Sequence, residues 1–179
     1  MAIVFHKESR CFHLYNAEVS YIIRIMENEQ LEQLYYGKRI HDREDFTYLH
    51  EECMRSQMSI NVPEPGILSM QYTKQEFPTY GTGDYRSPAL TIAQENGSRI
   101  VNFTYAFHEI YNGKKNILPL PSTYVESGDE AQTLEITLHD AVMDTDLILS
   151  YTIYEEYPVI TRNAKVSHNG SEKIVLDKI

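Results

Sequence analysis

Short segments in which apolar and polar residues alternate recur along the chain about every ten residues, with turn residues between them. In the clearest of them, Leu134, Ile136 and Leu138 take every second position. Because successive side chains of a strand point to opposite faces, this pattern predicts strands that bury one face. No stretch carries a 3.6-residue apolar stripe of useful length, and strands do not alternate with helices. The chain is therefore predicted to fold as an all-β antiparallel β-sandwich.

The expected strands cover residues 3–5, 11–15, 19–26, 30–36, 67–72, 89–94, 99–104, 103–111, 133–140, 147–154, 159–167 and 174–176. Residues 29–34 are also good helix formers, but the alternation over 30–36 favours a strand, with a hairpin turn at 27–29. The dipeptide Asn96-Gly97 lies between two alternating segments, which is the strongest short-range signal for a β-hairpin. Residues 89–94 and 99–104 are therefore expected to pair with each other.

The charge balance limits the kinds of partner. The formal net charge is −10 at pH 7, so the chain lacks the basic footprint that nucleic acids and anionic membrane surfaces require. No apolar run approaches the length of a membrane span. The seven histidines are scattered without ligand spacing, so no metal and no other cofactor is expected. A neutral ligand such as a sugar fits this charge, as do many other ligands.

The two cysteines, Cys11 and Cys53, form neither a CxxC pair nor a metal-type spacing. Reduced thiols in a cytoplasmic protein are the favoured interpretation, and a single disulfide is the alternative. The first residues lack the basic region and the long apolar run of a signal peptide, which agrees with a cytoplasmic location.

The segment 37–66 is the longest without a clear period, and it is rich in acids and histidines. A loop of this length inside a compact domain is usually functional or mobile, and a solvated insertion is the alternative. One helical turn is expected within residues 45–53. Adjacent acids such as Glu51 and Glu52 are more often solvated than catalytic, because a catalytic acid needs a cleft that shifts its pKa.

The stretch 75–89 combines three aromatic rings, two prolines, two glycines, two acids and an arginine. The prolines and glycines predict a sharp turn instead of a core strand. Tyr80 could offer a flat surface to a sugar ring or to a partner, and Asp84 and Arg86 would share one face of an extended segment. A purely structural turn with solvated charges is the alternative.

Several blocks of the sequence resemble, in order, the N-terminal domain of bacterial alpha-galactosidases of glycoside hydrolase family 36, the melibiase or raffinose type. The blocks are YGKRI at 36–40, QEFPTYG at 75–81, GDYRSPA at 83–89, LPSTYVE at 120–126, TLEITL at 133–138, YTIYE at 151–155 and VITR at 159–162. Together they span essentially the whole chain, which makes the resemblance far more specific than any one motif.

The resemblance implies a fold and a division of labour between domains. The N-terminal domain of the family resembles a β-supersandwich akin to the galactose-mutarotase fold, and it precedes a (β/α)₈ barrel that carries the catalytic aspartates. The reaction of the family is hydrolysis of terminal α-galactosides with retention, by two carboxyl groups about 5 Å apart. Because a barrel takes about 250 residues, residues 1–179 are expected to be a truncated sandwich domain of a longer enzyme, without catalytic residues and inactive alone.

The resemblance also implies contacts with substrate and with other subunits. The sandwich of one subunit reaches toward the active site of a neighbour in this family, so a homo-oligomer is expected. The corresponding segment here is 41–61, and its acids would accept hydrogen bonds from galactose hydroxyls. The candidates for this role are Asp42, Asp45, Glu51 and Glu52. Tyr80, Asp84 and Arg86 are expected to brace the sandwich against the barrel or a neighbouring subunit.

Two other functions stay open from the residues alone. One is a free-standing carbohydrate-binding sandwich. The other is a mutarotase-like enzyme, whose chemistry needs a histidine and a glutamate placed about a sugar ring as acid and base. His108 with Glu109 and His139 with Glu135 are the pairs that such an enzyme would use here.

Overall fold

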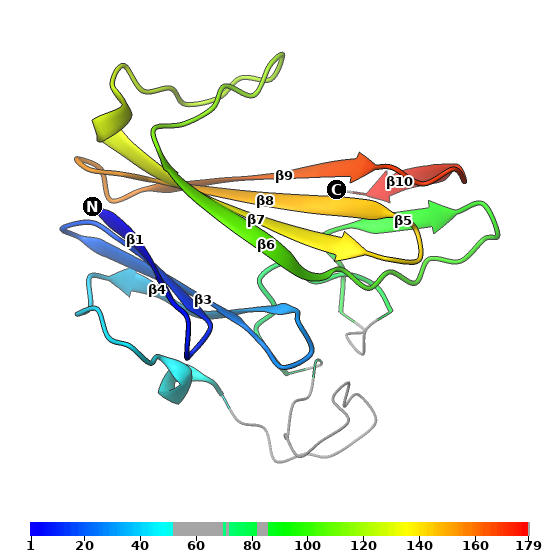
Figure 1. Ribbon diagram of the computed structural model, residues 1–179, viewed down its shortest axis with the longest axis horizontal. Helices are drawn as coiled ribbons and strands as arrows, with labels where there is room; N and C mark the ends of the chain where they lie inside the picture. Colours follow the sequence, from blue (N-terminus) through cyan, green and yellow to red (C-terminus); the bar gives the residue numbers. More distant parts are fainter. Residues whose placement is uncertain (52–69, 71, 82–85, 179) are drawn as a thin grey trace.

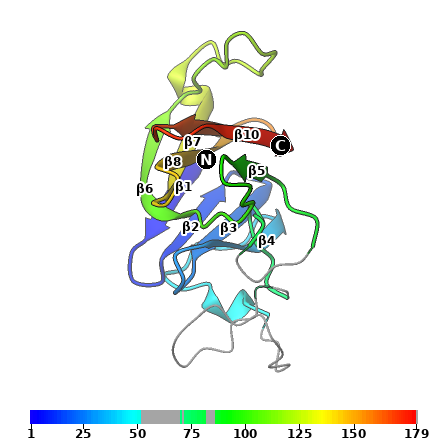
Figure 2. The same cartoon turned by 90° about the vertical axis from the view of Figure 1, so that its right-hand side faces the viewer.

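The computed structural model describes residues 1–51, 70, 72–81 and 86–178. Two four-stranded antiparallel sheets lie face to face, and a two-stranded sheet lies beside them (Figures 1 and 2). The first sheet consists of β1 (Ala2–His6), β2 (Cys11–Tyr15), β3 (Val19–Ile25) and β4 (Leu31–Lys38). The second consists of β6 (Thr104–Asn112), β7 (Ala131–Asp140), β8 (Thr145–Tyr154) and β9 (Ile160–His168). The small sheet pairs β5 (Thr91–Gln94) with β10 (Ile174–Lys178).

Both large sheets are built from strands that follow one another in the chain and pair with their sequence neighbours. β7 and β8 pair over their full length, from Ala131 opposite Tyr154 to Asp140 opposite Thr145. Leu134, Ile136 and Leu138 are buried in the core, as their alternation predicted. The prediction of an all-β antiparallel sandwich is therefore confirmed.

The hydrophobic core lies between the facing sides of the two large sheets. Its fully buried members include Phe12, Leu14, Ile23, Leu134, Ile136 and Ile153. Residues that precede β6 complete it, because Leu90, Ile92 and Phe103 are buried in the same cluster. Each such side chain contributes about 1.5–3 kcal/mol when it leaves water, so this cluster is what holds the two sheets together.

The hairpin expected between residues 89–94 and 99–104 is wrong in its second arm. The turn forms at Asn96-Gly97, where Gly97 has a φ of 84°, but β5 pairs with β10 and residues 99–103 form no strand. After the turn, the Val101 amide donates to the Tyr80 carbonyl oxygen at 3.1 Å, which draws the chain away from β5. The Asn-Gly signal therefore predicted the turn correctly, but tertiary contacts pair β5 with β10.

Two other local predictions are confirmed, and a third falls mostly on residues outside the described part of the chain. All of the expected strand 30–36 except its first residue lies within β4 and runs beside β3, so the strand interpretation is confirmed over the helical one. The helical turn expected within 45–53 is the 3₁₀ helix η1 (Thr47–Leu49). Residues 67–69 and 71 of the short strand expected at 67–72 lie outside the described residues. Among the described helices, none is long and apolar enough to cross a membrane.

Candidate functional site

Residues 39–50 lie against the outer face of the first sheet, and Phe46 is their hydrophobic anchor. Phe46 is fully buried among Cys11, Ile22 and Leu34. Cys11 and Ile22 face this side because the next residue in each strand, Phe12 or Ile23, points into the main core. A second, smaller core therefore fixes the first part of the segment predicted to reach a substrate.

A hydrogen-bonded chain forms the second anchor. The Oδ1 atom of Asp42 lies 2.6 Å from Nδ1 of His13 and 3.0 Å from Nε2 of His6. His13 is fully buried, and its Nε2 lies 2.9 Å from Oγ of Ser20, which accepts a hydrogen bond from the Ile40 amide at 3.0 Å. A neutral His13 satisfies all of these groups, since Nδ1–H donates to the carboxylate and Nε2 accepts from the hydroxyl.

The third anchor joins His50 to β4. Nδ1 of His50 lies 2.6 Å from Oε1 of Glu32, and the Glu32 side chain is 3% exposed. The other carboxylate oxygen of Glu32 has no hydrogen-bond partner among the described residues, and Nε of Arg24 lies 3.8 Å from it. Asp42, Phe46 and His50 thus attach residues 39–50 to the first sheet near the start, at the middle and at the end of this range.

Acid is expected to weaken the second anchor. Burial lowers the pKa of His13. Burial alone would raise the pKa of Asp42, but the hydrogen bonds from His13 and His6 outweigh it, so this pKa is also lowered. The folded chain therefore resists protonation at both groups, and stability falls as the pH drops from the ordinary imidazole value of 6.5 through the lowered pKa of Asp42. One such group accounts for at most about 1.4 kcal/mol per pH unit.

The measurement is urea unfolding of the chain at a series of pH values. His13→Gln keeps a polar side chain but cannot titrate, so its stability should fall less steeply than that of the wild type just below pH 6.5. An NMR titration should also find the wild-type imidazole still neutral below its ordinary pKa. Identical slopes for variant and wild type would remove His13 from this account.

The acids predicted to contact substrate have different surroundings. Asp45 is exposed, and its carboxylate accepts hydrogen bonds from the amide and the hydroxyl of Thr47 at 2.7 and 3.0 Å, which lower its pKa. Glu51 is exposed and pairs with Lys74. Asp42 belongs to the histidine anchor, and Glu52 lies outside the described residues. Figure 1 shows the 3₁₀ helix η1 on the outer side of the first sheet.

Of the residues predicted to brace the domain, Tyr80 lies in the turn that follows residues 74–76, which run beside β4. Tyr80 is 45% exposed. One guanidinium nitrogen of Arg86 donates to the carbonyl oxygens of Met70 and Thr73 at 3.2 and 2.8 Å, so Arg86 is hydrogen-bonded to the backbone that precedes the turn. Asp84 lies outside the described residues. The role of these three residues in an interface stays a prediction.

A buried carboxylate in the same stretch escaped the sequence reasoning. Glu76 lies between the sheets, accepts hydrogen bonds from Tyr21 and Tyr151 at 2.5 and 2.9 Å, and pairs with Arg162 at 2.5 Å. Burial raises the pKa of Glu76 although Arg162 opposes the shift, and burial also raises the pKa of both tyrosines. No local signal distinguishes this acid, because its partners come from β3, β8 and β9.

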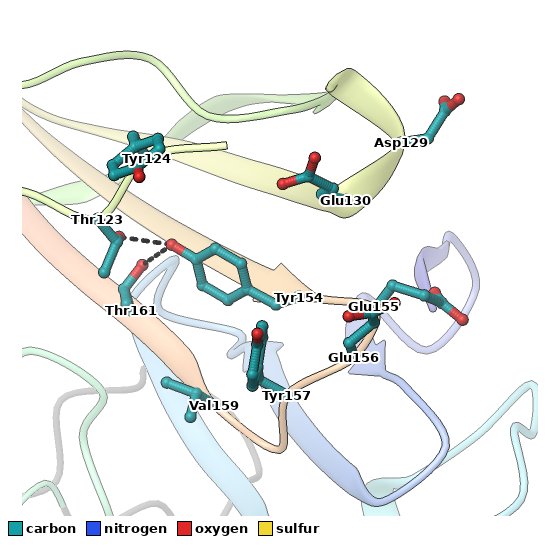
Figure 3. A pocket seen from close by; sticks show the side chains of 10 residues that line it. All are labelled: Thr123, Tyr124, Asp129, Glu130, Tyr154, Glu155, Glu156, Tyr157, Val159 and Thr161. Carbon is teal, nitrogen blue, oxygen red and sulfur yellow. Dashed lines mark hydrogen bonds between the residues drawn. The ribbon is translucent and has the colours of Figure 1, made fainter. Parts of the chain in front are cut away.

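A pocket of about 540 Å³ lies at the end of the second sheet, between residues 123–130 and the turn from β8 to β9 (Figure 3). Its lining residues are Thr123, Tyr124, Asp129, Glu130, Tyr154, Glu155, Glu156, Tyr157, Val159 and Thr161. The hydroxyl of Tyr154 lies 2.6 Å from that of Thr123 and 3.2 Å from that of Thr161, so the ring joins the two walls. Sequence reasoning identified parts of both walls by resemblance, but it did not predict that they enclose a pocket.

The histidine and glutamate pairs of a mutarotase-like enzyme have other partners. His108 and Glu109 are consecutive in β6, so they point to opposite faces. His139 lies 2.8 Å from Asp146, whereas Glu135 bonds to Lys115 and Tyr111. Within the described ranges, no group of three or more histidines, cysteines and acids is arranged to hold a metal ion.

The fold and these anchored segments define an all-β sandwich domain that presents loops at its surface. The model of the glycosyl hydrolase family 36 N-terminal domain matches residues 29–179. The chain therefore belongs to this family, as its sequence blocks indicated.

Curated and solved relatives agree with this assignment. Alpha-galactosidase AgaA of Geobacillus stearothermophilus is 35% identical over 98% of this chain and 24% of its own length. The structure of the Lactobacillus brevis alpha-galactosidase matches 98% of this chain and 24% of that one, with 34% identity and a TM-score of 0.92. A variant of AgaA solved in complex with raffinose is 37% identical over 94% of this chain and 23% of its own, with a TM-score of 0.85. The chain thus spans about a quarter of the length of these relatives.

Proposed function

We propose that residues 1–179 are the N-terminal sandwich domain of an enzyme that hydrolyses terminal α-galactosides with retention of configuration. The family match over residues 29–179 carries this proposal, with relatives about four times as long as this chain. Bond breaking is assigned to a catalytic barrel in another part of the parent enzyme, where two carboxyl groups about 5 Å apart would act as nucleophile and acid/base. The chain by itself is expected to be inactive.

The domain is proposed to help bind the galactoside. Asp45 and Glu51 would accept hydrogen bonds from sugar hydroxyls, and Glu52 is the third candidate. Asp42 is less suited, because the histidine anchor already occupies its carboxylate. The three anchors support this role, since they hold the segment in one position before substrate arrives and so reduce the entropy lost on binding.

We also propose a substrate, an interface and a cytoplasmic location for this parent enzyme. A raffinose-type oligosaccharide would be the substrate, as in the complex of the AgaA variant. Tyr80, Asp84 and Arg86 would contact the catalytic barrel or a neighbouring subunit of a homo-oligomer. The buried free thiol of Cys11 fits the reducing conditions of the cytoplasm.

Kinetics of the parent enzyme test the proposal. Asp45→Ala or Glu51→Ala should lower kcat/KM for raffinose by about ten- to a hundredfold, mainly through KM, because a hydrogen bond to a charged acceptor is lost. Glu109→Ala, which removes an exposed acid from β6, is the matched control and should leave both constants unchanged. Wild-type constants for both loop variants would remove these acids from the site, and a parent without α-galactosidase activity would overturn the whole assignment.

A further inference from the structure

The pocket between residues 123–130 and the β8–β9 turn has the dimensions of a small-molecule site. Its volume of about 540 Å³ falls in the range of about 300–1,000 Å³ that is usual for such sites. Tyr124 and Tyr157 are 72% and 62% exposed, so two aromatic side chains lie at its opening, while Tyr154 is 8% exposed at its base. Large exposed aromatic residues that gather around one cavity mark an interaction site more often than single ones do.

Hydrogen bonds to backbone groups hold both walls of the pocket in place. The side-chain amide of Asn16 donates to the carbonyl oxygens of Tyr154 and Tyr157, at 2.8 Å each, and fixes the β8–β9 turn. On the other wall, Ser127 and Glu130 form a capping box around the 3₁₀ helix η2 (Gly128–Glu130). The Glu155 amide donates to the Glu130 carbonyl oxygen at 2.9 Å and links the walls. The pocket is therefore formed before any ligand arrives.

The polar groups at the rim suit a ligand rich in hydroxyls. Over the described part of the chain, the carboxylates of Asp129 and Glu156 make no hydrogen bond or ion pair, so both remain free to accept. The Glu155 carboxylate pairs with the amino group of Met1. In Figure 3, Glu130 lies on one side of the Tyr154 ring and Tyr157 on the other. Aromatic faces beside carboxylate acceptors match a pyranose, which has an apolar face and a rim of donors.

We propose that this pocket binds a neutral pyranose unit without help from any other part of the parent enzyme. Anionic ligands are disfavoured, because four acids line the pocket and no basic side chain does. The choice of galactose as the sugar rests on the proposed function, whereas binding in the pocket does not depend on hydrolysis by the parent.

The test is an NMR titration of the ¹⁵N-labelled chain with methyl α-galactoside and with raffinose. A Kd on the order of 1 mM is expected for so open a site. Shifts should be confined to residues 123–130 and 154–161, and Tyr157→Ala or Tyr124→Ala should weaken binding about tenfold. Both tyrosines are exposed, so their loss should not prevent folding. Tyr72→Ala removes an exposed tyrosine elsewhere and should bind like the wild type.

Three results would overturn the proposal. They are no shift with either sugar, shifts that lie outside the two walls, and binding of tetramethylammonium, an aromatic-cage ligand, where the sugars do not bind. None of these depends on the parent enzyme, so failure here is distinct from failure of the kinetic test of Asp45 and Glu51.

Discussion

Replacing Glu76 by alanine is expected to lower the free energy of unfolding by about 3–5 kcal/mol. The carboxylate accepts from Tyr21 and Tyr151 and pairs with Arg162, and its side chain is 1% exposed. Alanine would leave the buried hydroxyls of Tyr21 and Tyr151 without this acceptor, and neither could regain water, whereas the half-exposed Arg162 would lose only its partner. Because Tyr21 belongs to the first sheet and Tyr151 to the second, the loss falls on the contact between the sheets.

Urea unfolding of the chain measures this effect. Glu76→Gln should lie between wild type and alanine, because the amide oxygen can still accept from one tyrosine while its NH₂ group cannot accept at all. Glu18→Ala removes an exposed acid whose side chain makes no hydrogen bond or ion pair to any described residue, and it should change stability by less than about 0.5 kcal/mol. Equal midpoints for Glu76→Ala and Glu18→Ala would show that the buried network does not stabilise the sandwich.

The strands could be predicted because their signal is local. Burial of Leu134, Ile136 and Leu138 follows from alternation within one segment, and the fold class follows from the repetition of that pattern. Pairing is not local, and the failed hairpin shows the difference. The turn at Asn96-Gly97 depends on four residues, whereas the choice of β10 as the partner of β5 depends on a segment some eighty positions further along the chain.

The residues of the candidate site show the same difference between local and non-local signals. Asp45 and Glu51 became candidates for substrate binding only through resemblance to a family, since nothing in their spacing distinguishes them from solvated acids. Glu76 stayed hidden because its tyrosine partners lie 55 and 75 positions away. The anchor between His13 and Asp42 spans 29 positions and combines residue types that are common at surfaces. Buried polar networks of this kind become visible only when the strands that carry their members are paired.

Replacing Phe46 by alanine is expected to release residues 39–50 from the first sheet and to cost about 3 kcal/mol. Phe46 fills the second core with Cys11, Ile22 and Leu34, and its ring lies 4.9 Å from that of His13 in an edge-to-face arrangement. The main core keeps its own contacts, so the segment can detach while the sandwich stays folded. Amide hydrogen exchange should therefore accelerate at Ile40, whose amide bonds to Ser20, and stay slow in β7 and β8.

The same variant links stability to the proposed role in binding. In the parent enzyme, Phe46→Ala should raise KM for raffinose because Asp45 and Glu51 lose their fixed position, while both acids remain in the sequence. Tyr48→Ala is the matched control, since Tyr48 belongs to the same segment but is 61% exposed. Equal exchange rates and equal KM for the two variants would mean that the second core does not position the acids. Faster exchange with an unchanged KM would separate the anchoring from the substrate, and would leave the segment a purely structural cover for the first sheet.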